Sequence, residues 1–250
     1  MLLFIGLGAL FSWIIIEMTV VKLTGNAVRV SEKSFPEINQ IYLALKKEMK
    51  LKEGVPIFIV QDGEVNGYVA KHLNRRFIIL NSELVAGMKN GDQELSEIEW
   101  VIARFLGALK TKHFRFNLFY FLVDTAEETF VLNFLLKPYE RATQFTGDNI
   151  GLLANKNLET SISAMHKIMI GNGLSKEVKM EAILHQAMIL SKRSFFAWMA
   201  KAYSNHPYNV QRFLNLLGFA KKEFPDQFRD YVNQLEPEYR RALEGLMVVY

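Results

Sequence analysis

The chain has 250 residues, of which 50% are hydrophobic and 22% charged, and it contains no cysteine. This composition excludes a disordered chain, a collagen-like fibre and a disulfide-stapled mini-domain, and it removes thiol nucleophiles and thiolate metal ligands. Lysine and arginine number 30 against 26 acidic residues, a net charge of +4. Because the basic residues are scattered, we expect no nucleic-acid partner, and an anionic membrane surface fits better.

The first 16 residues carry no charge, and apolar character resumes after Glu17. The stretch reaches the roughly 20 residues needed to span a bilayer only if Glu17 lies at an interface. Basic residues follow the segment instead of preceding it, which favours a retained anchor over a cleaved signal peptide. We therefore expect residues 1–22 to form an N-terminal hydrophobic anchor helix, with a single pass and a cytoplasmic body. The alternative is a buried core helix, or a helix and a strand that dock on the body as a hairpin.

Residues 23–250 show no repeat and no linker, which predicts a single domain. A helix is expected from Pro36 to the break at residues 52–54. Two short runs rich in β-branched and aromatic residues, 56–60 and 76–80, are expected to form a small antiparallel sheet.

Helices are predicted over most of the remaining chain. The strongest covers residues 94–113, where Ser96 and Glu99 form a capping box before a run of apolar residues at helical spacing. Residues 115–136 carry three carboxylates in an apolar stretch, which favours a buried or membrane-surface helical hairpin over a spanning helix. Further helices are expected at 138–153, 158–170, 176–190, 209–223 and 237–247, so the fold class is α+β and mostly helical.

Several stretches stand in an informative order: GNAVRV at 25–30, FPEI at 35–38, VNGYVA at 65–70, FIILNSEL at 77–84 and the helix at 101–113. Together they resemble the HtpX-type family of membrane-associated zinc metallopeptidases. These gluzincins carry HExxH on one helix and a glutamate ligand on the next. The resemblance implies a zincin fold, with a substrate cleft beside an edge strand that contains Asn66 and Tyr68.

The same resemblance shows where the chemistry of the family is missing. On its register Arg104 replaces the first ligand histidine, Phe105 the catalytic glutamate and Ala108 the second histidine. In the later element R-x-x-E-x-x-x-D, Gln144 stands at the third ligand and Asp148 keeps the supporting carboxylate. Because arginine, alanine and phenylalanine cannot serve as zinc ligands or as a general base, we expect no metal, no cofactor and no peptide hydrolysis by this mechanism.

A third element of the family, HP-x-x-x-x-R, is resembled by His206, Pro207 and Arg212, which implies that His206 lies near the cleft. A simple stop between two helices is the other interpretation of His206-Pro207. The remaining histidines show no metal-binding spacing, and the sequence has no P-loop, no dinucleotide fingerprint and no Gly-x-Ser-x-Gly.

The substitutions are consistent with one another electrostatically. Loss of a metal would leave buried acids unpaired, which is costly, and here two of the acids are replaced as well. We therefore predict that Arg104 pairs with Asp148 and joins two helices in place of the metal. The alternatives are pairing of Arg104 with Glu97 or Glu99, or an arginine that extends to solvent.

We accordingly expect a catalytically inactive metallopeptidase-like protein that binds or regulates a protein or peptide partner, with a membrane contact through its first helix. Strand addition at the edge strand would hold the partner. There are two alternatives. One is a hydrolase with a different, non-zinc site in the same cleft, and the other is a membrane scaffold that forms homo-oligomers. The candidate cleft residues are Asn66, Tyr68, Arg104, Phe105, Ala108, Gln144, Asp148 and His206.

Overall fold

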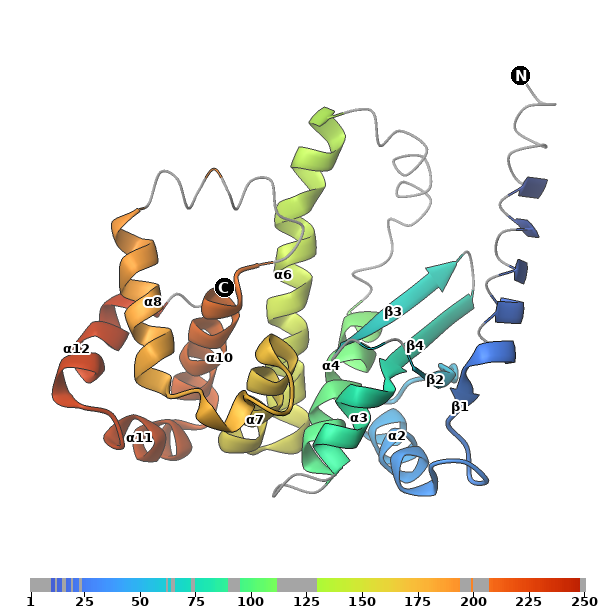
Figure 1. Cartoon of the computed structure of the whole chain (residues 1–250), viewed down its shortest axis with the longest axis horizontal. Coiled ribbons are helices and arrows are strands. Elements are labelled where there is room, and N and C mark those ends of the chain that lie inside the picture. Colours follow the sequence, from blue (N-terminus) through green and yellow to red (C-terminus); the bar gives the residue numbers. More distant parts are fainter. Residues whose placement is uncertain are drawn as a thin grey trace.

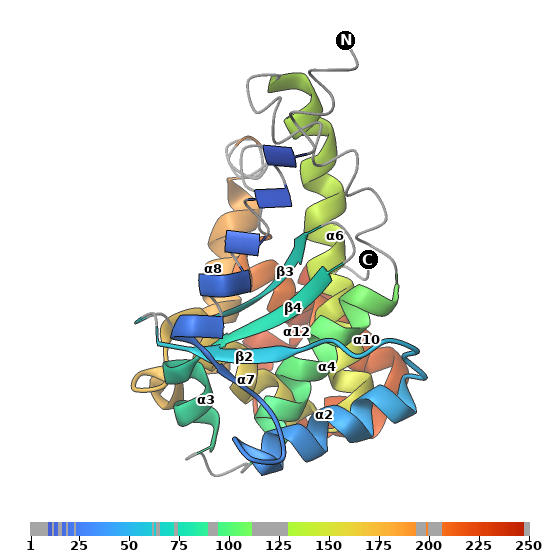
Figure 2. The same cartoon turned by 90° about the vertical axis from the view of Figure 1, so that its right-hand side faces the viewer.

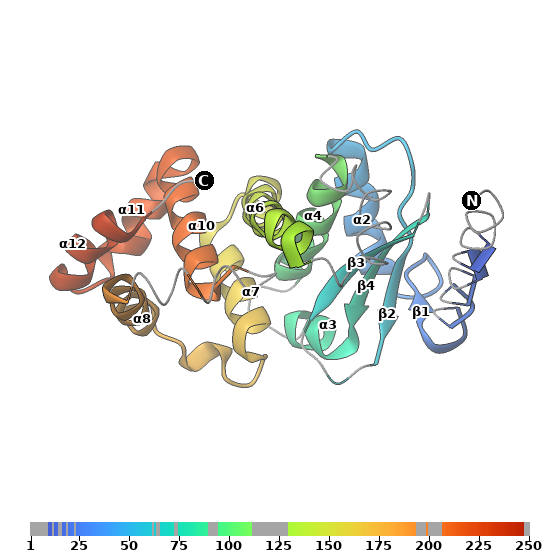
Figure 3. The same cartoon turned by 90° about the horizontal axis from the view of Figure 1, so that it is seen from above.

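The computed structural model describes residues 10–11, 13–14, 17–18, 20–22, 24–61, 63, 66–72, 75–89, 95–111, 130–193, 199 and 207–247. The protein is mostly helical, with one small four-stranded sheet, and its class is α+β as expected. The elements form a row in which the sheet and the N-terminal helical segment lie at one end. The helices α8 (Met180–Lys192), α11 (Pro225–Asn233) and α12 (Pro237–Leu246) lie at the other (Figure 1, Figure 3).

The sheet is mixed, so the prediction of a purely antiparallel sheet is wrong. Its strands are β1 (Val28–Arg29), β2 (Ile57–Val60), β3 (Gly67–His72) and β4 (Arg75–Asn81), in the spatial order β1-β2-β4-β3. The two strands foreseen from sequence, β2 and β4, pair in parallel, while β1 and β3 are antiparallel to their neighbours. β3 pairs with β4 in the antiparallel direction, so β4 runs in the same direction as β2.

The alternation of side chains gives the sheet two buried faces. Ile57, Ile59, Ile78 and Leu80 face the main core, which extends through the helices as far as Leu243. Phe58, Phe77 and Ile79 face the other side, where Val20 and Ala27 of the N-terminal segment pack against them. The N-terminal segment thus lies on one side of the sheet, and the helices α2 (Pro36–Glu48), α3 (Ser82–Lys89) and α4 (Ser96–Lys110) lie on the other (Figure 3).

The helices of the described residues include the predicted ones, most of them with small shifts at their ends, and two that were not predicted, at 82–89 and 225–233. They are α2 (Pro36–Glu48), α3 (Ser82–Lys89), α4 (Ser96–Lys110), α6 (Phe130–Asn155), α7 (Leu158–Ile170), α8 (Met180–Lys192), α10 (Asn209–Glu223), α11 (Pro225–Asn233) and α12 (Pro237–Leu246), with a short 3-10 turn at Ser175–Glu177. α7 and α10 begin and end where the sequence predicts. At α7 the side chain of Asn157 accepts a hydrogen bond from the backbone N–H of Thr160, which fixes the start of the helix.

Two details of the helix predictions are wrong. Ser96 is the first residue of α4 and Leu95 is its cap without a side-chain hydrogen bond, so the capping box is not formed. α6 begins at Phe130, and Pro138, expected to open a helix, lies inside it. The apolar run before Pro138 was therefore a stronger helix signal than the proline. Of the hairpin predicted at residues 115–136, the part up to 129 lies outside the described residues.

Much of residues 10–26 is helical and leaves the body on the same side as the N-terminal half of α6 (Figure 1, Figure 2). Val20 packs on the sheet, but other apolar side chains of this segment face outward, with Phe11 65% and Val21 67% exposed. A continuous anchor helix over residues 1–22 is not found among the described residues, and residues 1–9 lie outside them. No described helix is both long enough and apolar enough to cross a bilayer.

α4 and α6 pack closely because glycines lie at their crossing. A Cβ added to Gly107 of α4 would come within 2.4 Å of the Ile150 side chain, and one added to Gly151 of α6 would come within 2.6 Å of the Trp100 indole nitrogen. Trp100 is fully buried. A Cβ on Gly147 would likewise lie 3.1 Å from Cγ of Arg104. The absence of side chains at these positions therefore sets the distance at which α4 faces α6.

This crossing predicts that Gly107→Ala destabilises the protein. The added methyl group has no room beside Ile150, so we expect a loss of about 2 kcal/mol in the free energy of unfolding, measured by chemical denaturation. Gly245→Ala, in α12, is the matched control, since nothing lies within 4 Å of its added Cβ. The control should be neutral or slightly stabilising, because alanine favours helix. Equal effects of the two changes would contradict close packing at the crossing.

Candidate functional site

The centre of the candidate site is the carboxylate of Asp148, which is completely buried and shared by two arginines. Nε of Arg104, from α4, lies 2.8 Å from Oδ1. Arg212, from α10, donates two parallel hydrogen bonds, from Nε to Oδ2 at 2.8 Å and from Nη2 to Oδ1 at 2.9 Å. One acid on α6 thus joins three helices through two guanidinium groups.

The ion pair predicted between Arg104 and Asp148 is therefore confirmed, and neither Glu97 nor Glu99 is the partner of Arg104. The Arg104 side chain is 11% exposed and lies 5.4 Å from the Phe105 ring centroid and 6.0 Å from that of Trp100. Burial and the nearby positive charge of Arg212 lower the pKa of Arg104 to about 10, against the opposing effect of Asp148. Arg104 consequently remains a cation at neutral pH.

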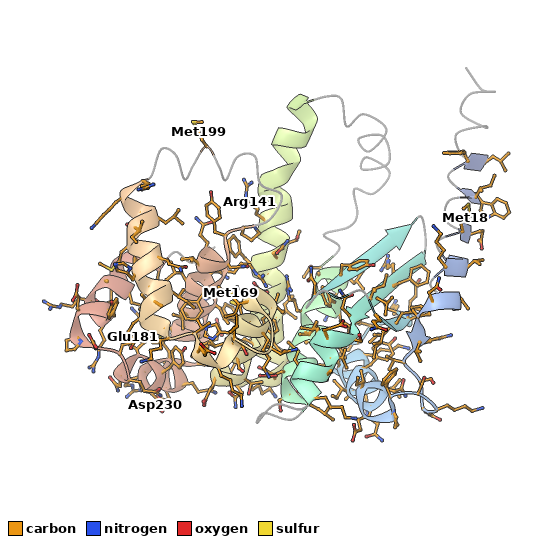
Figure 4. The ribbon with its side chains drawn as sticks, in the orientation of Figure 1. Met18, Arg141, Met169, Glu181, Met199 and Asp230 are labelled. Atoms are coloured by element: carbon orange, nitrogen blue, oxygen red, sulfur yellow. The ribbon has the colours of Figure 1, made fainter. Side chains whose placement is uncertain are left out.

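Gln144 lies on the same side of α6 as Asp148, one turn earlier. Its side-chain oxygen is 3.5 Å from Nη2 of Arg104, a long and weak contact. Arg141, the first residue of the same sequence element, also lies on α6 and is buried (Figure 4). The positions that the family resemblance assigns to a first and a third metal ligand are therefore adjacent across the contact between α4 and α6.

The edge strand and α4 meet at Gly67 and Phe105. A Cβ on Gly67 would lie 3.2 Å from the Phe105 ring, and the backbone N–H of Gly67 donates to the side-chain oxygen of Asn66 at 2.8 Å. Tyr68 is 46% exposed on β3, and Ala108 is half-buried on α4, one turn beyond Arg104. Seven of the eight candidate residues thus lie on β3 or just before it, on α4 and on α6. His206 lies outside the described residues.

The residues at the position that the resemblance assigns to a metal do not fit a zinc ion. The side chains of Arg104, Phe105 and Ala108 offer no lone pair to a metal, and the guanidinium of Arg104 already occupies one oxygen of Asp148. Elsewhere in the described part of the chain, no three His, Asp or Glu side chains converge as a metal site would require. His166 is a core residue stacked on Phe213, and burial lowers its pKa to about 4, so it is neutral at pH 7.

A second buried ion pair fixes the N-terminal end of α4, and sequence reasoning did not foresee it. Glu97 accepts hydrogen bonds from Nζ of Lys167 and from Oγ of Ser163, both on α7, at 2.5 Å each. Nζ of Lys167 also donates to the backbone oxygen of Gly87 at 3.1 Å. The charges of Glu97 and Lys167 thus pair with each other and with neighbouring groups of the protein, so the cluster holds α4 against α7 and α3.

Sequence reasoning also missed the role of Arg212, although it included this residue in a family element. No pattern in the sequence pointed to this role, because the burial of Asp148 and the position of Arg212 beside it follow from the packing of α10 on α6. Compared with known proteins, the chain matches no family model, no curated protein and no solved structure.

The shared carboxylate predicts that Asp148→Asn is strongly destabilising. The change leaves two arginines buried without a counter-ion, so we expect a loss of about 3–5 kcal/mol in the free energy of unfolding, read from denaturant titration. Asp226→Asn makes the same chemical change in an exposed pair with Arg229 and should cost less than about 1 kcal/mol. A mild effect at Asp148, similar to that of the control, would show that the two arginines do not depend on this acid.

Proposed function

We propose that the protein is a non-catalytic relative of the zinc metallopeptidases, with a zincin-like fold whose cleft holds an extended protein segment without cutting it. The segment would add as a strand to the edge formed by β3, and α4 would form the floor beneath it. The observation that carries the proposal is the ion pair between Arg104 and Asp148, a cation at the position where the family resemblance puts a metal.

The arrangement of the elements supports a cleft of this kind. Within the described residues β3 pairs only with β4, so the other side of β3 has backbone groups that a partner strand could pair with. β3 runs antiparallel to its neighbour β4, and Gly67 at the start of β3 contacts Phe105 of α4. The next long described helix, α6, presents Gln144 and Asp148 to α4.

The chemistry of the substituted positions supports binding without hydrolysis. HExxH works because two histidines hold a metal that lowers the pKa of its bound water, and the glutamate takes the proton. Phe105 and Ala108 supply neither a base nor a ligand. The positive charge that the surrounding structure needs is supplied instead by Arg104.

Restoring the ligand set tests the proposal directly. With Arg104→His, Phe105→Glu and Ala108→His, residues 104–108 read His-Glu-Leu-Gly-His, and Gln144→Glu adds the third ligand. If the fold is zincin-like, the quadruple variant should bind one zinc ion per chain, by elemental analysis of the purified protein, and the unchanged chain should bind none. The zinc charge would take over from the guanidinium beside Asp148.

The control is the triple variant that keeps Gln144, which should bind zinc at least about tenfold more weakly because one of its three protein ligands is missing. Stoichiometric zinc in the unchanged chain, or peptidase activity that a chelator abolishes, would overturn the proposal. A folded quadruple variant that takes up no zinc would remove the zincin-like fold from it.

The same proposal includes a membrane contact through the N-terminal segment, with the body on the cytoplasmic side. Exposed Leu10, Phe11, Trp13 and Val21 support it, since a soluble surface rarely leaves so many large apolar side chains together. The N-terminal half of α6, with the apolar sequence FVLNFLL at 130–136, leaves the body on the same side (Figure 2).

Deletion of residues 1–21 tests the membrane contact. The truncated chain should move from the membrane fraction to the soluble fraction of cells, because most of the exposed apolar surface of this segment is removed. A truncated chain that sediments with membranes as completely as the full chain would assign the contact to another part of the molecule.

A further inference from the structure

The guanidinium of Arg104 has hydrogen-bonding capacity that the described contacts do not use. An arginine carries five N–H donors, and Arg104 uses its Nε on Asp148 and makes only the 3.5 Å contact from Nη2 to Gln144. Both oxygens of Asp148 are already occupied, because Arg212 binds them in parallel. The remaining N–H donors of the Arg104 guanidinium are therefore available to another acceptor, and the side chain is 11% exposed.

The charge of the cluster favours an anion as that acceptor. Two cations, Arg104 and Arg212, share the single negative charge of Asp148, so the three groups together carry a net charge of +1 in a buried setting. Burial and the repulsion from Arg212 depress the pKa of Arg104, and a further negative charge would offset both effects because it favours the charged guanidinium. An acceptor of neutral charge, such as a backbone carbonyl, would relieve them less.

The guanidinium also lies within reach of the proposed partner strand. The Phe105 ring bridges the two, since it is 5.4 Å from the Arg104 guanidinium carbon on one side and packs against Gly67 at the start of β3 on the other. A strand added to β3 would advance about 3.3 Å per residue, and the proposed register would bring one of its side chains or its end past Phe105 to Arg104. Half-buried Ala108 and Gln144 flank this position and carry no charge.

From these observations we infer that Arg104 is a specificity residue that binds a carboxylate of the held peptide, from either a glutamate or aspartate side chain or the C-terminus. The inference rests on the proposed peptide-binding function and adds the chemistry of what is recognised. A planar guanidinium binds a planar carboxylate with two parallel hydrogen bonds, which provides direction as well as charge.

The test uses the full chain in detergent and ten-residue peptides attached to a surface by their N-termini, with randomised interior sequences. Each peptide is made in three versions: a free C-terminal carboxylate with a central glutamine, a C-terminal amide with a central glutamate, and a C-terminal amide with a central glutamine. We expect one or both carboxylate versions to bind at least about tenfold more tightly than the neutral version. The first two versions show which source supplies the carboxylate.

Variants of α4 tie the preference to Arg104. Ala108→Glu places an internal carboxylate one helical turn from Arg104, where it competes for the guanidinium, so the preference should fall to below about threefold. Ala108→Gln, of the same size and neutral, should keep it. Arg104→Gln should abolish the preference for a carboxylate. Lys110→Gln removes a positive charge from an exposed position on α4 and should leave the preference unchanged. Thermal unfolding of each variant checks that it folds. If Arg104→Gln does not fold, Ala108→Glu still tests the inference, because it retains the buried ion pairs.

The outcomes separate the two proposals. Peptides that bind equally well in all three versions would overturn the inference and leave peptide binding in place. A preference that Ala108→Glu and Ala108→Gln reduce equally would also overturn it, because the contact would then depend on size and not on charge. If no peptide of any version binds, the proposed function fails, and the inference fails with it.

Discussion

The arrangement of the helices depends on one buried acid. Asp148 is removed from water entirely, which costs several kcal/mol for a charged group, and this cost is offset only by close and well-directed counter-charges. Arg104 and Arg212 provide them from α4 and α10. Separating α4, α6 and α10 would leave buried charges unpaired, which costs more free energy than having no charges there. The three helices are therefore held together as one unit. The geometry of the candidate site follows from this unit.

Close packing supplies the second constraint. The buried charges can meet only because Gly107, Gly147 and Gly151 remove side chains from the contact between α4 and α6. Trp100 fills the remaining space and lies beside Arg104, so an aromatic face borders the cation. Steric and electrostatic terms therefore favour the same placement of the two helices, which is the consistency expected of a well-specified fold.

Local patterns were informative where the structure is locally determined. The limits of α7 and α10 follow from apolar spacing and from signals at the ends of the helices, and both agree with the structure. The direction of β4 relative to β2 could not be predicted in this way, because parallel and antiparallel pairing use similar strand residues and differ in the path of the chain between them. The start of α6 was missed because a proline outweighed, in the prediction, the apolar residues before it.

For the candidate site, the pair of Arg104 and Asp148 could be predicted from the sequence, since both positions lie in stretches that resemble elements of one family and their charges are opposite. Arg212 lies 64 residues beyond Asp148, and only the packing of α10 reveals that it shares the same acid. Glu97 was equally hidden, because an acid in the first turn of a helix is ordinary, and nothing local indicates that Lys167 covers it.

The two buried ion pairs of α4 also limit how the molecule can respond to a partner. Glu97 and Arg104 are seven residues apart, about 10 Å along the helix axis, and each is tied to a different neighbouring helix. Because α4 is held at both positions, a shift along its axis or a rotation about it would separate buried opposite charges that water cannot reach. If the protein holds a peptide as proposed, the adjustment to that peptide would fall to β3, which the described sheet supports on one side only. With α4 fixed in place, selection between peptides would then depend on how well each one fits.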